Sequence, residues 1–216
     1  MTETLFQKKL IKLIPKTFEK VLIINFFDEH LIQHVKQNKE TFLAGILAVD
    51  ESTIPCKSEF NSIHYLKLGK NKLPFEDECF NLIIGNNIFS ECSSLPKTIS
   101  EINRILSADG ILMCIEPNVQ FYPHFINLLE GDWDETLGED TPKLHFFTQE
   151  SLSILLSNSL FNVLTKVPIE IASQESFIIN SDGFVHTGKY NIGPLTNNEY
   201  KMFLCKKFLI LASRLK

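Results

Sequence analysis

The chain has 216 residues, which suits one well-buried hydrophobic core and is short for two independent domains. Its composition is ordinary for a globular protein, with 44% hydrophobic and 22% charged residues. The net charge of −5 argues against a nucleic-acid partner, because proteins that bind phosphate backbones usually need a concentrated basic face. The lysines of the first twenty residues are spaced instead like the polar side of a helix.

The five cysteines are odd in number and far apart, so they suggest neither a zinc site nor a disulfide framework. The N-terminus alternates lysine with leucine and isoleucine, which is unlike a signal peptide. No segment approaches the roughly 20 consecutive apolar residues that span a bilayer. We therefore expect a cytoplasmic protein without a transmembrane segment.

The first half of the chain alternates helices and strands with short joints. Residues 5–14 have helical spacing that Pro15 ends, and residues 28–37 predict a second helix whose Asp28 and Glu29 suit its positive N-terminal end. Five buried strands are predicted at residues 20–25, 44–50, 62–68, 80–86 and 111–117, the last preceded by an amphipathic helix at 94–106 and a turn at Asp109-Gly110. This alternation predicts a parallel sheet with helices on both faces.

After residue 118 the alternation loosens. An acidic stretch at 130–140 precedes a predicted helix at 148–158, a strand at 161–169 and a final strand at 206–213. No linker or repeat divides the chain, so we expect one domain over residues 1–216. The fold class is α/β: a doubly wound, Rossmann-like and mostly parallel sheet of about seven strands, with the last strand antiparallel.

Several segments carry a resemblance to a known family. LPFEDECFNLIIGNNIFSEC (73–92) and EINRILSADGILMCIEPN (101–118) resemble the middle of the class I S-adenosylmethionine-dependent methyltransferases of the type 11-like group. LIPKTFEKVLIINFFDE (13–29) is similar to the family's opening strand and turn. Residues 131–163, with Trp133 and His145, resemble methyltransferases that accompany surface-polysaccharide biosynthesis.

The resemblance implies a cofactor-side half (1–118) and an acceptor-side half (119–216), with S-adenosylmethionine as cofactor if the protein is active. The family's first turn runs roughly D-x-G-x-G-x-G, where glycines let the backbone approach the cofactor. Residues 23–29, IINFFDE, hold those places without a glycine. Phe26 and Phe27 would take up the cofactor's space, and Asp28 and Glu29 would oppose its carboxylate.

Other candidates for cofactor binding remain. Asp50 matches the family's acid that pairs with the ribose hydroxyls, although a turn acid is the alternative interpretation. The acid that contacts adenine is missing, and Asn71 is its nearest substitute because an amide oxygen accepts from an amine. Asn86 follows the fourth strand, where family members carry polar residues near the reacting methyl group. Asn25, within the altered turn, completes the set.

Other candidate residues have structural alternatives. Trp133 suits stacking on a sugar ring of an acceptor or capping of the sheet. His145 suits a general base toward an acceptor hydroxyl, or a residue that fixes the loop before the helix N-cap Thr148. His30 and His34 are spaced to share a metal, but a surface pair is the simpler interpretation. The acids of 130–140 lack the spacing of a calcium loop, so a solvated segment is expected there.

Three functional hypotheses follow. The first is a pseudoenzyme: a methyltransferase-like scaffold that binds a protein partner or a glycan intermediate, has abandoned its cofactor, and fills the cofactor crevice with Phe26 and Phe27. The second is an active methyltransferase, acting on a glycan hydroxyl, that holds S-adenosylmethionine in an altered pose through Asp50. The third is a different ligand-binding module that reuses the same crevice.

Overall fold

The structure of the protein, a computed structural model, describes residues 4–48, 54, 56–172, 178–179 and 182–215. Its centre is a seven-stranded sheet in the order β3-β2-β1-β4-β5-β10-β6. The strands are β1 (Lys20–Ile24), β2 (Phe42–Leu47), β3 (Ser62–Tyr65), β4 (Phe80–Asn86), β5 (Leu106–Pro117), β6 (Phe161–Ile171) and β10 (Cys205–Arg214). The first five are mutually parallel, and β10 is antiparallel to both β5 and β6. The predicted fold class is confirmed.

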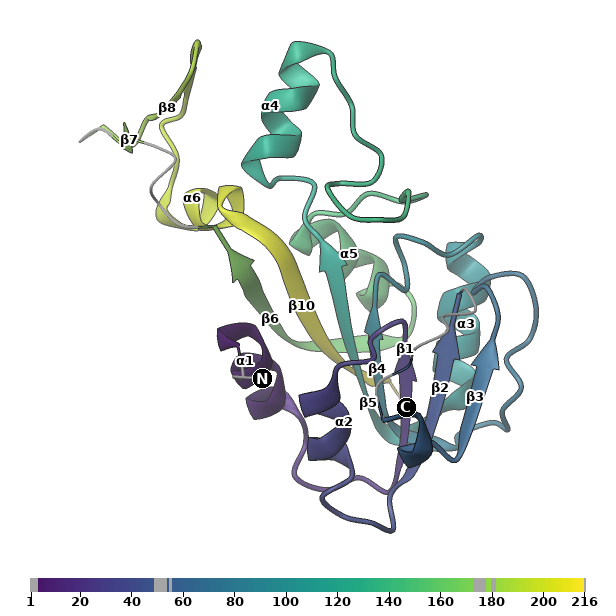
Figure 1. Ribbon diagram of the computed structural model, residues 1–216. Helices are drawn as coiled ribbons and strands as arrows, with labels where there is room; N and C mark the ends of the chain where they lie inside the picture. Colours follow the sequence, from purple (N-terminus) through teal and green to yellow (C-terminus); the bar gives the residue numbers. More distant parts are fainter. Residues whose placement is uncertain (1–3, 49–53, 55, 173–177, 180–181, 216) are drawn as a thin grey trace.

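Helices cover both faces of the sheet (Figure 1). On one face lie α1 (Leu5–Leu13) and α2 (Glu29–Val35), and on the other lie α3 (Leu95–Ile105) and α5 (Gln149–Ser157). The remaining elements are the short helix η1 (Lys57–Glu59), α4 (Tyr122–Glu130), α6 (Asn197–Phe203), and a small sheet of β7 (Ile178–Ile179), β8 (Val185–Thr187) and β9 (Tyr190–Ile192).

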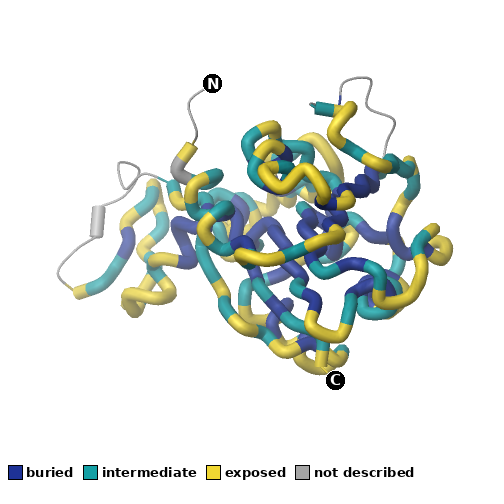
Figure 2. Tube along the Cα trace, turned by 90° about the horizontal axis from the view of Figure 1, so that it is seen from below, coloured by how far each residue is buried: buried dark blue, intermediate teal, exposed yellow. Residues whose placement is uncertain are grey.

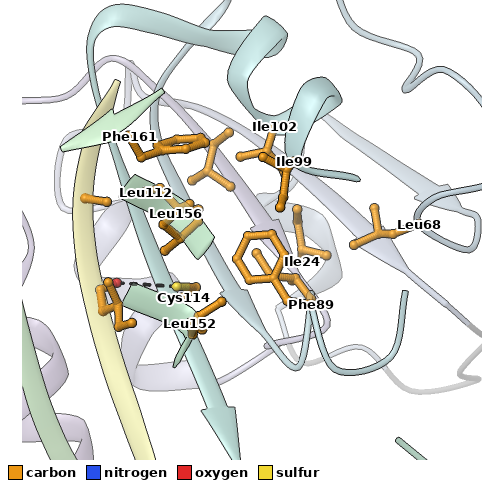
Figure 3. Packing of buried hydrophobic residues seen from close by; sticks show 14 of the residues in the cluster. Ile24, Leu68, Phe89, Ile99, Ile102, Leu112, Cys114, Leu152, Leu156 and Phe161 are labelled. Atoms are coloured by element: carbon orange, nitrogen blue, oxygen red, sulfur yellow. Dashed lines mark hydrogen bonds between the residues drawn. The ribbon is translucent and has the colours of Figure 1, made fainter. Parts of the chain in front are cut away.

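Two hydrophobic clusters fill the spaces between the sheet and its helices. In β1, Leu22 and Ile24 point into the cluster below α3 and α5, whereas Val21 and Ile23 point into the cluster below α1 and α2. All four side chains are fully buried, which is why this strand is a continuous apolar run. Figure 2 shows buried chain through the middle of the molecule, and Figure 3 shows the α3/α5 cluster at close range.

The structure also differs from the expected elements. β5 begins at Leu106, and the predicted turn at Asp109-Gly110 lies inside it as an irregularity of its register with β4. Helix α4 was not expected, because its sequence YPHFINLLE has a single charged residue and therefore no recognisable polar face. Helix α6 and the small sheet were also missed in the stretch that looked irregular.

Candidate ligand crevice

A crevice opens at the carboxyl ends of the central strands. The chain runs outward from β1 to β2 and β3 on one side and returns at β4 on the other, so the strand order reverses between β1 and β4. In open α/β sheets ligands bind at this reversal. Here a cavity of about 350 Å³ lies there, lined by residues after β1, β2, β3 and β4 and by the segment 141–144.

The lining of the crevice combines amide, acidic and basic groups over an apolar floor. Asn25 and Asn87 contribute from the two central strands, and Glu91 lies one turn further on. Lys67 and Lys70 are exposed at the mouth. Such a mixture suits a small polar ligand, because a few placed polar groups on an apolar lining fix a ligand's orientation.

The turn after β1 is closed by the side chain of Asn25. This residue has a positive φ of 51°, a conformation that asparagine tolerates better than most residues. Its backbone N–H donates to Ile46 O at 3.0 Å, and its Oδ1 accepts from Ala48 N–H at 3.0 Å. Asn25 therefore ties the ends of β1 and β2 together, while one side of it still lines the crevice.

The rings of Phe26 and Phe27 do not line the crevice, contrary to the expectation that they fill it. Both pack toward the α1/α2 face of the sheet. The ring of Phe26 meets Phe6 edge to face, with centroids 5.9 Å apart, and Phe27 lies 5.4 Å from Phe60. Gly45 makes this possible, because a Cβ there would lie 3.0 Å from the ring of Phe27. The absence of a side chain at Gly45 in β2 thus leaves room for the ring of Phe27.

The N-terminal end of α2 is occupied by the protein's own carboxylate. Asp28 is the N-cap, and its Oδ1 accepts from Leu31 N–H at 2.9 Å. Its Oδ2 accepts from Gln7 Nε2 of α1 at 2.5 Å. Glu29 adds a second acid in the first turn. The positive end of the helix is therefore already neutralised, and a ligand carboxylate placed there would meet like charge.

The turn after β4 is held from below by Glu116 at the end of β5. The carboxylate of this fully buried residue accepts from Phe89 N–H at 2.8 Å and from Ser90 N–H at 3.1 Å. Burial raises the pKa of Glu116 to about 7, although these two donors act in the opposite direction. Gly85 lets Ile88 fold back over β4, since a Cβ at Gly85 would lie 2.4 Å from Ile88 Cγ2.

A network of charged groups connects the turn after β4 to the segment 131–146. The fully buried ammonium of Lys143 lies 2.7 Å from Glu91 Oε1 and 2.8 Å from Glu139 Oε2. Glu139 also pairs with Lys207 of β10, whose Nζ donates to Asn86 Oδ1 at 3.1 Å. Asn87 joins both halves, because its Nδ2 donates to Glu91 at 2.9 Å and to Glu139 at 2.6 Å.

The protonation of this network follows from its pairing. Burial would lower the pKa of Lys143, but hydrogen bonds to Glu139 and Glu91 outweigh it and raise the pKa. Burial likewise would raise the pKa of Glu139, but Lys207 and Lys143 hold it below its usual range. The interpretation of 130–140 as simply a solvated segment is therefore wrong at Glu139, which pairs with two lysines and pins the segment beside the crevice.

The other residues singled out from the sequence lie in varied places. Asp50 lies outside the described residues. Asn71 is exposed in a neighbouring depression with Lys72 and does not line the crevice. Trp133 is 40% exposed and meets Phe146 edge to face. His145 Nε2 donates to Cys92 O at 3.1 Å, and its backbone N–H donates to Ser90 O, which is the loop-fixing arrangement.

Catalytic and metal-binding groups are sparse. Among the residues that the structure describes, no three His, Cys, Asp or Glu side chains are placed to hold a metal ion, so His30 and His34 lack a third ligand there. Burial raises the pKa of Cys92, the thiol beside the crevice, which keeps it protonated and unreactive. Sequence reasoning missed Glu116 and Lys143, although an acid within the apolar run ILMCIEP was a usable signal.

Comparisons with known proteins agree with this fold. Residues 35–114 match a family described as a methyltransferase domain, and no curated protein matches the chain. A methyltransferase from Archaeoglobus fulgidus described as SAM-dependent is similar in structure, with a TM-score of 0.64 at 14% identity, covering 96% of this chain and 90% of the other. One from Aquifex aeolicus, also described as SAM-dependent, has a TM-score of 0.59 at 14% identity, covering 97% and 89%.

A third similar structure is a complex from Haloferax volcanii. It contains the methyltransferase activator Trm112 and a protein described as a methyltransferase, with a TM-score of 0.62 at 13% identity, covering 97% of this chain and 88% of the other. At these identities the likeness establishes the fold, and the matched segment supports a relationship to the methyltransferases. The protein has the Rossmann-like fold of the S-adenosylmethionine-dependent methyltransferases. Within the described part of the chain, no helix is long and apolar enough to cross a membrane.

Proposed function

We propose that this protein is a non-catalytic relative of the S-adenosylmethionine-dependent methyltransferases that acts as a binding or accessory module. The observation that carries the proposal is the position of the Asp28 carboxylate on the N-terminal end of α2, held by Leu31 N–H and Gln7. A cofactor carboxylate directed to this helix end would have to displace Asp28 and tolerate Glu29 beside it. The residues present do not fit the methionine end of the cofactor.

The turn itself adds a second argument. A turn that cradles a cofactor needs backbone that the ligand can approach closely. Here the Asn25 side chain bridges the ends of β1 and β2 through Ala48 N–H. The next residue, Phe26, is anchored by its ring against Phe6 of α1. Opening this turn for a cofactor would break both contacts.

The proposal is tested by calorimetric titration of the intact chain with S-adenosylmethionine and, separately, with S-adenosylhomocysteine. We expect no binding heat up to millimolar ligand. Saturable binding of either compound at micromolar concentration would contradict the proposal. A thermal unfolding scan of the same sample confirms that the titrated protein is folded, so that an absence of heat is informative.

A second candidate is an active methyltransferase with an altered cofactor pose, acting on a glycan hydroxyl. The observation that favours it is the open crevice of about 350 Å³, which neither Phe26 nor Phe27 lines. In this case Asp50 supplies the ribose contact, and the exposed Trp133 suits stacking on a sugar acceptor. Asp50→Ala should then abolish cofactor binding, whereas Glu40→Ala, at the opposite end of β2, should leave it unchanged.

A further inference from the structure

Helix α4 presents an apolar stripe that the described structure does not cover. Figure 1 shows α4 standing away from the central sheet, and His124 is its one buried residue. Phe125, Leu128 and Leu129 are 37%, 55% and 48% exposed. Their spacing of three and four residues places them on one side of the helix. We call these three residues the α4 stripe.

The helix that carries the stripe is anchored at its start and capped at its end. At its start, Tyr122 lies against Phe203 of α6, with ring centroids 5.9 Å apart, and Phe125 approaches the same ring at 6.1 Å. At its end, Gly131 adopts the left-handed conformation and Asp132 N–H donates to Asn127 O at 2.9 Å. The stripe is therefore held on a well-terminated helix, as a preformed docking surface requires.

An aromatic pair lies just beyond the helix. Trp133 is 40% exposed and Phe146 is 38% exposed, and their rings meet edge to face with centroids 5.0 Å apart. Aromatic residues of this kind are enriched in protein interfaces, because they bury a large area at a low cost in conformational entropy. Trp133 follows Leu129 of the α4 stripe by four residues along the chain, and its contact with Phe146 brings that ring to it from the segment before α5.

The segment of the chain that carries the stripe is acidic. Residues 119–142 contain six acidic residues and no lysine or arginine. Glu130, Asp132 and Glu135 are exposed next to the end of the helix. Glu130 lies 3.4 Å from Lys189, which is a single exposed ion pair in this otherwise negative segment. Positive charge at the edge of a partner would therefore complement this segment.

We propose that the α4 stripe, together with Trp133, docks an amphipathic helix of a partner protein whose apolar face is flanked by lysine or arginine. A helix fits because anchors three and four residues apart match the ridges of another helix. The exposed acids disfavour an anionic membrane surface. The lysine-bearing helix α1 of a second copy of this chain does not supply the partner helix, because its apolar residues, Leu10 among them, pack into its own hydrophobic core. No α4 residue lines the crevice, so this proposal stands apart from cofactor binding.

The test uses a synthetic amphipathic helix of leucine and lysine, and a matched peptide of leucine and glutamate. Both are titrated into the intact protein. Trp133 is the chain's single tryptophan, so its fluorescence reports contact at the surface without a label. Anisotropy of the labelled peptide gives the dissociation constant. We expect saturable binding of the lysine peptide with a blue shift of Trp133, and no binding of the glutamate peptide.

Two variants locate the binding site. Leu129→Ala removes part of the α4 stripe, and Leu164→Ala removes an equally exposed leucine from β6, since both are 48% exposed. Leu129→Ala should raise the dissociation constant roughly fivefold, while Leu164→Ala leaves it unchanged. Asp132→Asn should weaken binding less and reduce its dependence on salt.

Several outcomes would overturn the proposal. They are equal binding of both peptides, equal effects of Leu129→Ala and Leu164→Ala, saturable binding to phosphatidylserine vesicles in place of the peptide, or self-association that Leu129→Ala abolishes. None of these outcomes depends on S-adenosylmethionine. A failure here is therefore distinguishable from a failure of the proposed function, which the cofactor titration decides separately.

Discussion

The two turns on either side of the crevice are built in opposite ways. The turn after β1 is closed by its own side chains: Asn25 accepts a hydrogen bond from Ala48 N–H, and Asp28 caps the helix that follows. The turn after β4 instead depends on distant residues, with Glu116 holding its backbone and Lys143 bridging it to the segment 131–146. The turn after β1, which contains no glycine, therefore forms a closed wall of the crevice, and the turn after β4 forms the opposite wall.

The difference between the walls is also one of charge. The β1 side presents Asp28 and Glu29 on a helix end, where negative charge is favourable. The β4 side buries charges of both signs in one network, which is stable only when every member keeps its partner. Disruption of the β4 side should therefore cost much more than disruption of the β1 side, and the following variants test that ordering.

The largest effect is expected from Lys143→Met. This change leaves the carboxylates of Glu91 and Glu139 without their shared buried cation, and should lower the free energy of unfolding by about 3 kcal/mol. The matched control is Lys166→Met, which removes the exposed ion pair with Glu150 and should cost no more than about 0.5 kcal/mol. Urea unfolding measures both. Equal losses would show that the network does not stabilise the β4 wall.

A second test concerns the buried acid below the β4 turn. The pKa of Glu116 is raised from its ordinary 4.5 to about 7, so the folded protein binds this proton more tightly than the unfolded chain. The resulting stabilisation is complete below pH 4.5 and is lost as the pH rises to about 7. The total amounts to at most about 3 kcal/mol.

Glu116→Gln isolates this contribution. The free energy of unfolding of the parent, followed by urea unfolding across the same pH range, should fall relative to that of the variant as the pH rises. Glu139 and Glu101 have a lowered pKa, so their contributions to the free energy of unfolding are lost as the pH falls. Both residues are present in the parent and in the variant, so these contributions cancel in the difference. Parallel pH profiles would mean that Glu116 titrates normally.

The strands of the β1 to β5 region can be predicted from the sequence because their burial requires a recognisable apolar run. A strand buried on both faces must be continuously apolar, and the runs at 21–24 and 82–85 meet that condition. The antiparallel β10 follows from the family resemblance rather than from its own pattern. Helix α4 is not predicted from the sequence because its exposed side is apolar. A helix is recognised from its sequence when one side is apolar and the other is polar.

The site is less predictable, because its contacts are long-range. The destination of the Phe27 ring depends on Gly45 and Phe60, which belong to other elements. Glu139 lies four residues from Lys143, but the second partner, Glu91, lies on the turn after β4, and no sequence pattern predicts that pairing. The absence of glycine after β1 is visible in the sequence, but the positions of the Phe26 and Phe27 rings are known only from the fold.

The smallest effect is expected on the β1 side, at Asp28. Asp28→Ala removes the N-cap of α2 and its bond to Gln7, and should lower the free energy of unfolding by about 1 kcal/mol. Asp28→Ser retains a capping oxygen and should cost less, yet it removes the negative charge that opposes a ligand carboxylate. Urea unfolding and cofactor calorimetry on both variants thus separate capping from repulsion. Equal losses would assign the stability to the Gln7 contact rather than to the cap, because serine is too short to keep that contact. Cofactor binding gained by both variants would identify the Asp28 carboxylate as the barrier, whereas binding by neither would place the barrier in the closed turn at Asn25.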